Sequence, residues 1–246
     1  NISKQLKIEL QNKFDLNFEF SQNLKYNFFP KPHFITSESI ILDNKTEISK
    51  IKKLKIFVSN DNFFSLKNIE ITDLVLENAN FNLNKENYNF FQNLLNKSFQ
   101  KTDLIIRDSN IFFRNSENEV LFINKIIKTK YYFEKKELKN IFYSENEIFN
   151  IPFSMKTILN NDKSKIISKI NFNQINLKIE NELTLNSNQK IGKSELIFKK
   201  LKRNINYQIE KNIFKFHMFD KIDEPTLSYK GEFNFKPFFA SLKGDL

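Results

Sequence analysis

The sequence predicts a mainly β protein, built as a long antiparallel meander with a short N-terminal helix and one helix near residues 87–100. Segments in which apolar and polar residues alternate recur through most of the 246 residues, with centres about ten residues apart. Only two segments change to the three-to-four spacing of an amphipathic helix. Parallel strands need a long crossover between them, so this is too few helices for a parallel sheet.

The alternation is most extensive in residues 69–83. Apolar residues that point to one side of a strand are Ile69, Ile71, Val75, Ala79, Phe81 and Leu83, and the residues between them are mostly polar. The pattern slips once, near Asp73 to Leu76, which indicates a β-bulge or a short turn between two strands.

The first segments of the chain predict a helix, a strand and a corner. Ile2, Leu6, Leu10 and Phe14 stand four residues apart, which favours a helix that plugs one end of a sheet, with a membrane-surface helix as the alternative. Residues 16–20 alternate as a strand. Two prolines in Phe29-Pro30-Lys31-Pro32 then force an extended corner, because proline breaks the hydrogen-bond ladder. Strands follow at residues 39–43 and 51–58.

The second helix is predicted by Phe90, Phe91, Leu94, Leu95 and Phe99, which recur three to four residues apart. A lid and a structural plug fit that pattern equally. From residue 103 onward the alternation predicts one strand after another, with centres in residues 104–106, 111–113, 121–123, 131–133, 141–143, 151–159, 170–172, 175–179, 183–185, 196–198, 205–209, 214–216 and 233–235.

The amino-acid composition limits the kinds of site and structure that the chain can form. With 29 Phe the chain can fill a sizeable core, and with 3 Gly it has no phosphate-binding loop, so Asn is expected at positions of positive φ. The absence of Cys excludes disulfides and thiolate metal sites. The net charge of +10 comes from dispersed residues, which favours a compositional bias over a basic binding patch. Since the chain begins with Asn1 and ends within a strand pattern, we expect an anchor upstream and more strands downstream.

No residue pattern indicates catalysis. The two histidines, His33 and His217, have no carboxylate at a metal-ligand spacing, and no acidic pair is evident, so we expect no enzyme activity, metal or cofactor. Aromatic and basic residues meet in Tyr131-Tyr132, Phe142-Tyr143 and Phe112-Phe113-Arg114, but mainly on the apolar side of strands. Core packing is therefore favoured over nucleic-acid stacking, and no nucleic-acid partner is expected.

The order of features resembles the AsmA-like family of bacterial envelope proteins, which includes TamB-type and bridge-like lipid transfer proteins. The resemblance covers residues 1–125. It rests on the helix ending at Phe14, the Phe29-Pro30-Lys31-Pro32 corner, the ribbon of residues 69–83 and the segment Asn87-Tyr88-Asn89-Phe90-Phe91. Residues 231–238 are similar to the Gly, strand, Pro-Phe steps further along such chains.

The resemblance implies a single unit of residues 1–246, in which the sheet curls into an open apolar groove that is AsmA-like in residues 1–125 and continues as further groove strands in 126–246. It also implies an inner-membrane anchor before Asn1, a periplasmic location, and carriage of phospholipid acyl chains between the inner and outer membranes, with the membrane and envelope proteins as partners. The expected lining residues are Ile69, Ile71, Phe81, Leu83, Ile111, Phe113, Ile170, Phe172, Ile205, Tyr207 and Ile209. A structural or assembly factor for outer-membrane biogenesis, and a basic nucleic-acid-binding protein, remain as alternatives.

Overall fold

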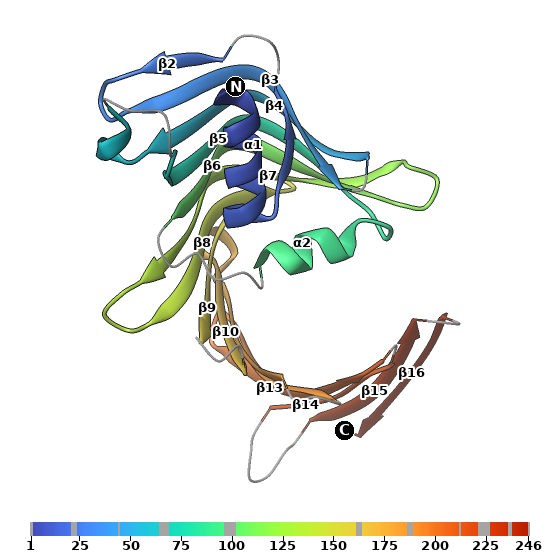
Figure 1. Ribbon diagram of the computed structural model, residues 1–246. Helices are drawn as coiled ribbons and strands as arrows, with labels where there is room; N and C mark the ends of the chain where they lie inside the picture. The colour runs from blue at the N-terminus through green and yellow to red at the C-terminus, as the bar shows by residue number, and fades with distance from the viewer. Residues whose placement is uncertain are drawn as a thin grey trace. The chain divides into compact units, whose positions relative to one another are not determined.

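A computed structural model describes residues 2–20, 24–43, 45–63, 69–95, 102–160, 164–185, 189–211, 213–220, 227–235 and 238–245. The predicted mainly β class is confirmed: one 16-stranded sheet has two short α-helices beside it (Figure 1). Contacts divide the chain into two compact units, residues 1–151 and 152–246. None of the described helices has the length and apolar character needed to span a membrane.

The first unit holds both α-helices and eight strands. Its helical elements are α1 (Ile2–Phe14), the 3-10 turn η1 (Asn60–Phe63) and α2 (Tyr88–Leu95). Its strands are β1 (Asn17–Glu19), β2 (Lys25–Asn27), β3 (His33–Asp43), β4 (Thr46–Val58), β5 (Ile71–Leu83), β6 (Asp103–Arg114), β7 (Val120–Glu134) and β8 (Lys139–Ile148).

The second unit is formed almost entirely by strands. They are β9 (Ile151–Asn160), β10 (Lys165–Phe172), β11 (Leu177–Leu185), β12 (Lys190–Phe198), β13 (Leu201–Glu210), β14 (Ile213–Phe219), β15 (Ser228–Phe235) and β16 (Phe238–Asp245), with the 3-10 turn η2 (Asn173–Ile175) between β10 and β11. From β9 to β16 each strand pairs antiparallel with the next one along the chain, as the meander predicts.

The first unit departs from the meander at β1, which pairs with β3 rather than with β2, and again between β5 and β6. Strands β5 and β6 pair in parallel, and α2 lies in the connection between them (Figure 1). A parallel pair needs such a crossover, and the predicted helix supplies it. The helix is described as far as Leu95, so Phe99 and the rest of residues 96–100 lie outside the described residues.

The core of the first unit forms where α1 meets the sheet. Leu6, Leu10 and Phe14 are fully buried and belong to the same cluster as side chains of β3 to β7. The Lys13 ammonium also donates to the backbone oxygen of Ile71 at 2.7 Å, which joins the last turn of α1 to β5. The four-residue spacing therefore marks the buried stripe of this helix, as the sequence predicts.

Strand β5 slips twice rather than once. Its inward side chains are Ile71, Leu74, Leu76, Ala79 and Phe81. The first slip is a bulge against the end of β4, and the second lies at Asn78, which has a φ of 54°. Val75, expected on the inward side, therefore points to the other side, opposite Lys55 of β4.

The second slip is shared by neighbouring strands. Glu38 of β3 and Asp108 of β6 also have positive φ, and the register places both at the level of Asn78. Because the strands change phase together, their apolar side chains stay on one side of the sheet above and below this line. The backbone N–H of Ala79 bonds the buried Ser109 hydroxyl at 2.9 Å.

Asn was expected to supply the positive-φ positions, and it does so only in part. Twelve non-glycine residues among those described have positive φ; four are Asn, and the others include Asp, Glu and three Lys. No described glycine has positive φ. The three glycines of the chain therefore serve another purpose, which the packing of the second unit explains.

Candidate functional site

The second unit has one predominantly apolar face. Residues paired directly across neighbouring strands share a face, so the register assigns each side chain. One row across β9 to β16 is Leu159, Ile166, Leu183, Gly192, Tyr207, Phe216, Gly231 and Leu242. The flanking rows of this side add Met155, Ile170, Ile179, Leu196, Ile205, Met218, Tyr229, Ile209, Phe214 and Phe233. We call this side of residues 152–246 the apolar face.

Five predicted lining residues lie together on the apolar face: Ile170, Phe172, Ile205, Tyr207 and Ile209. All five are partly exposed. In this unit, sequence alternation therefore assigned the side chains to one common surface.

The six predicted residues of the first unit have different surroundings. Ile69, Ile71 and Phe81 are buried in the core cluster that includes α1, with exposures of 6%, 0% and 6%. Phe81 also lies against Phe91 of α2, with ring centroids 6.4 Å apart. These three are packed within the core of the first unit.

The other three are less enclosed. Register pairs Phe81 with Ile111, and Leu83 with Phe113, so all four share a face, and Ile111 packs against the edge of the core cluster. Phe113 stacks on Phe122 of β7 at a centroid distance of 4.2 Å. Leu83, Ile111 and Phe113 thus lie where the core of the first unit becomes partly exposed.

The three glycines of the chain each lie opposite an aromatic residue on the apolar face. The pairs are Gly192 with Tyr207, Gly231 with Phe216, and Gly244 with Tyr229. A Cβ added to any of the three glycines would come within 3.0 Å of the paired ring. Each ring therefore lies across the neighbouring strand in space that only glycine leaves open.

The Tyr207 ring extends across β12 and reaches β11. Its hydroxyl donates to Asn181 Oδ1 at 2.7 Å, and the Ser194 hydroxyl donates to the same oxygen at 2.7 Å. Burial raises the pKa of the Tyr207 phenol, and the hydrogen bond to Asn181 opposes that rise only in part. The arrangement fixes a flat aromatic ring and a small polar cluster within the apolar face.

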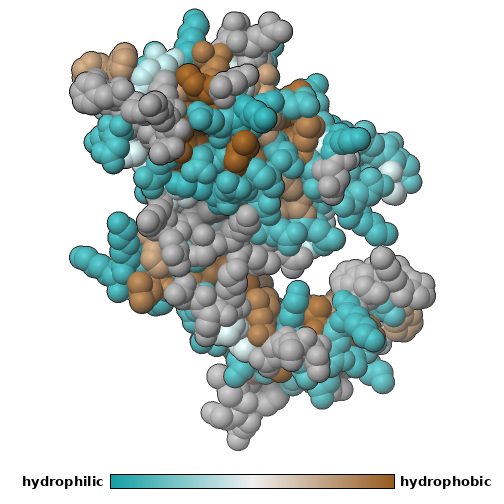
Figure 2. All heavy atoms as spheres, in the orientation of Figure 1, coloured by the Kyte–Doolittle hydropathy of each residue, from teal (hydrophilic) through white to brown (hydrophobic). Residues whose placement is uncertain are grey.

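The rings of β13, β14 and β15 form a continuous aromatic surface. Phe214 lies 5.4 Å from Tyr207, and Phe216 stacks on Phe233 at 5.7 Å with an interplanar angle of 11°. Beside these rings is a hollow of about 550 Å³, lined by Phe216, Met218, Tyr229, Phe233, Ala240, Ser241 and Leu242. Figure 2 shows hydrophobic side chains of the second unit reaching the surface among hydrophilic ones.

Most of this aromatic surface was absent from the predicted lining. Phe214, Phe216 and Phe233 were recognised only as strand residues, and Met218 and Tyr229 were not singled out. The signal available in the sequence was the alternation of Phe214 and Phe216. The glycines gave no such signal, because each aromatic partner is 15 residues away and the pairing depends on register.

Several charged side chains form ion pairs within the sheet. In the first unit Glu77 accepts from Lys55 at 2.7 Å and lies 3.0 Å from Lys53. Burial alone would raise the pKa of Glu77, but the hydrogen bonds from the two lysines outweigh it and hold this pKa below its ordinary value. In the second unit the face opposite the apolar face carries the pairs Lys165–Glu182, Lys169–Glu180, Lys178–Glu180, Lys202–Glu195 and Lys215–Glu232.

The histidines lie apart from any acidic cluster. His33 is 6% exposed, its Nδ1 is 2.8 Å from the Lys31 backbone oxygen, and its ring stacks on Phe57. His217 Nε2 is 2.8 Å from the Ser228 hydroxyl. Within the described part of the chain, no three His, Asp or Glu side chains come together as a metal site would require.

Comparison with known proteins does not identify the chain. No family model matches it, and no curated protein matches it. The candidate site is therefore defined by its own geometry, which is an apolar, aromatic-rich face of eight strands.

Proposed function

We propose that the apolar face of residues 152–246 binds phospholipid acyl chains, and that the protein carries or conducts them as a non-enzymatic component of the bacterial envelope. The observation that carries the proposal is a contrast between the two units. In the first unit α1 buries the apolar side of the sheet, whereas among the described residues of the second unit the only helical segment is the three-residue turn η2. Apolar side chains that remain partly exposed among the described residues indicate a ligand or partner.

An acyl chain suits this face chemically. Most of its side chains are aliphatic or aromatic, with one polar row of Thr157, Ser168, Asn181 and Ser194 on β9 to β12. The aromatic strands β13 to β15 therefore offer contact mainly to methylenes. Each CH₂ removed from water contributes about 0.8 kcal/mol, so six shielded methylenes contribute about 5 kcal/mol. Rows that continue from strand to strand would let a chain slide without losing contact.

The cellular setting in the proposal comes from the resemblance of residues 1–125 to AsmA-like proteins. It places the protein on the periplasmic side of the inner membrane, with phospholipid movement to the outer membrane as the process it supports. Lipid binding can be tested without that setting.

The test is lipid analysis of gently purified protein by extraction and mass spectrometry. We expect bound phospholipid in the wild type and a severalfold lower lipid-to-protein ratio in Ile205→Gln/Met218→Gln, which places two amides on the apolar face. Thr184→Gln is the control, because Thr184 lies on the opposite face of the same sheet. Repeated preparations without phospholipid, or equal lipid in both variants, would contradict the proposal.

The second candidate is a structural or assembly factor whose apolar face packs on another protein. The exposed Leu242, 66% accessible beside the 550 Å³ hollow, favours it as a contact residue. This reading predicts no lipid but a stable assembly that Leu242→Gln dissociates, measured by light scattering. A nucleic-acid role would require binding that weakens steeply as the salt concentration rises. The ion pairs on the face opposite the apolar face oppose such a role, because they neutralise several of the lysines there.

A further inference from the structure

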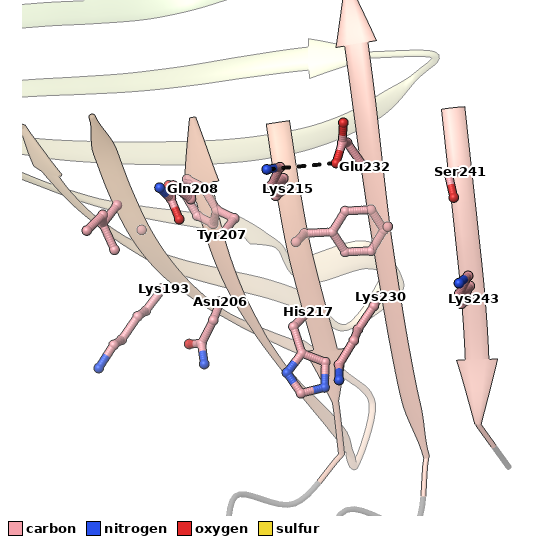
Figure 3. A pocket seen from close by; sticks show the side chains of 14 residues that line it. Lys193, Asn206, Tyr207, Gln208, Lys215, His217, Lys230, Glu232, Ser241 and Lys243 are labelled. Atoms are coloured by element: carbon pink, nitrogen blue, oxygen red, sulfur yellow. Dashed lines mark ion pairs between the residues drawn. The ribbon is translucent and has the colours of Figure 1, made fainter. Parts of the chain in front are cut away.

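The face opposite the apolar face contains a row of basic and amide side chains on five adjacent strands. Direct register pairs join Lys193 to Asn206, Asn206 to His217, His217 to Lys230 and Lys230 to Lys243. Neighbouring strands are about 4.8 Å apart, so each side chain begins beside the next. Figure 3 shows Lys193, Asn206, His217 and Lys230 projecting in a common direction from their strands.

This basic row differs from most of the other lysines of the same face, although Lys156, opposite Lys169, also has no described carboxylate partner. Five of those, named above, each lie within 4.0 Å of a glutamate. No described carboxylate lies within that distance of Lys193, Lys230 or Lys243. Lys230 and Lys243 are directly opposite each other, an arrangement of like charges that destabilises a sheet unless an anion compensates.

The row also lines a hollow. Its five side chains border a space of about 620 Å³, large enough for a phosphate group with its substituents. Lys215 lies on the border as well, but it pairs with Glu232 at 4.0 Å (Figure 3). The unpaired positive charge therefore concentrates at Lys230 and Lys243, next to His217.

His217 adds an oriented ring to the two ammonium groups. The contact of Nε2 with the Ser228 hydroxyl fixes the ring plane. When that hydroxyl donates to Nε2, the ring proton resides on Nδ1 and can be donated to an anion. Three adjacent strands thus offer two ammonium groups and one imidazole to the same ligand, with the Asn206 amide next in the row.

We infer that His217, Lys230 and Lys243 form a binding site for a phosphate group, extended along the sheet by Asn206 and Lys193. Phosphate oxygens accept charge-assisted hydrogen bonds from ammonium and imidazole groups, and the bound charge removes the repulsion between Lys230 and Lys243. The same chemistry fits the headgroup of an anionic phospholipid and a soluble phosphate ester.

The two histidines of the chain provide the assay. In a proton NMR titration with inorganic phosphate, at constant pH and ionic strength, we expect the Cε1–H resonance of His217 to move saturably. His33, buried in the first unit, is the internal control and stays in place. His217→Gln assigns the two signals. If His217 moves no more with phosphate than with chloride, the site does not exist.

Matched charge variants test the residues. Each ammonium close to the anion contributes about fivefold in affinity, so Lys230→Gln/Lys243→Gln is expected to bind about 25-fold more weakly. Lys169→Gln/Lys202→Gln removes the same charge from the same face but from lysines already paired with glutamate, and is expected to bind within about twofold of wild type. Equal weakening in the two variants would overturn the assignment in favour of a general charge effect.

A vesicle sedimentation assay distinguishes the two sources of the phosphate group. If the wild type sediments with phosphatidylglycerol vesicles and Lys230→Gln/Lys243→Gln does not, the ligand is a lipid headgroup. If phosphate shifts the His217 resonance but the protein does not sediment with the vesicles, the ligand is a soluble ester. This site stands apart from the proposed acyl-chain function, because it lies on the opposite face. The Ile205→Gln/Met218→Gln variant should keep the phosphate response.

Discussion

Replacing Gly192 with alanine tests whether the glycines of the second unit exist to make room for aromatic rings. The added Cβ would fall within 3.0 Å of the Tyr207 ring, so the ring must leave its position across β12. That movement also removes the 2.7 Å hydrogen bond to Asn181. The backbone itself is not an obstacle, since no described glycine has positive φ.

The magnitude follows from three contributions. Overpacking costs about 1–3 kcal/mol, and the lost hydrogen bond costs about 1 kcal/mol. Alanine is favoured over glycine within a strand by about 0.5–1 kcal/mol, which offsets part of the cost. We therefore expect Gly192→Ala to lower the free energy of unfolding by about 1–3.5 kcal/mol, measured by urea unfolding followed by circular dichroism.

A double-mutant cycle supplies the control. In a Tyr207→Ala background the ring is absent, so Gly192→Ala should be neutral or stabilising by about 0.5–1 kcal/mol. Tyr207→Phe separates the hydrogen bond from the packing and should cost about 1 kcal/mol. An equal loss from Gly192→Ala with and without the Tyr207 ring would refute the reasoning.

Three further predictions concern the first unit. Glu77→Gln should cost about 1 kcal/mol at neutral pH, and because the pKa of Glu77 is lowered in the folded state, the difference from wild type should vanish as pH falls through that lowered pKa in acid urea titrations. Ser109→Ala should cost about 1–3 kcal/mol, since it leaves the Ala79 N–H buried without its acceptor; a change below about 0.5 kcal/mol in thermal unfolding would count against this. Burial raises the pKa of Tyr131 well above its ordinary value of 10.0, so the folded state keeps a proton that the unfolded chain loses. Stability should therefore be complete below about pH 10 and decline above it, and Tyr131→Phe should decline less steeply in urea unfolding between about pH 8 and pH 11.

The sequence carried enough information for the local structure. The four-residue spacing of Leu6, Leu10 and Phe14 fixed the buried stripe of α1, and alternation placed Ile205, Tyr207 and Ile209 on one face. These features depend on side-chain direction within a single helix or strand, which the periodicity of the backbone sets. The two slips in β5 were reduced to one, because they cancel: Ile71 and Ala79 have the same parity, so Val75 could be placed between them on the same side.

The sequence did not determine which strands pair or in which register. Whether β5 meets β6 in parallel, and whether Gly192 meets Tyr207 or Lys230 meets Lys243, depends on register between segments that alternation treats alike. The sequence also did not determine which apolar side chains are covered by other elements. Ile71 and Ile170 have the same pattern, yet only Ile71 lies in the core cluster that includes α1. By itself the sequence determined which side of each strand is apolar, since that follows from residues two apart. Only the tertiary structure decided what lies against that side, because contacts between distant segments form through packing.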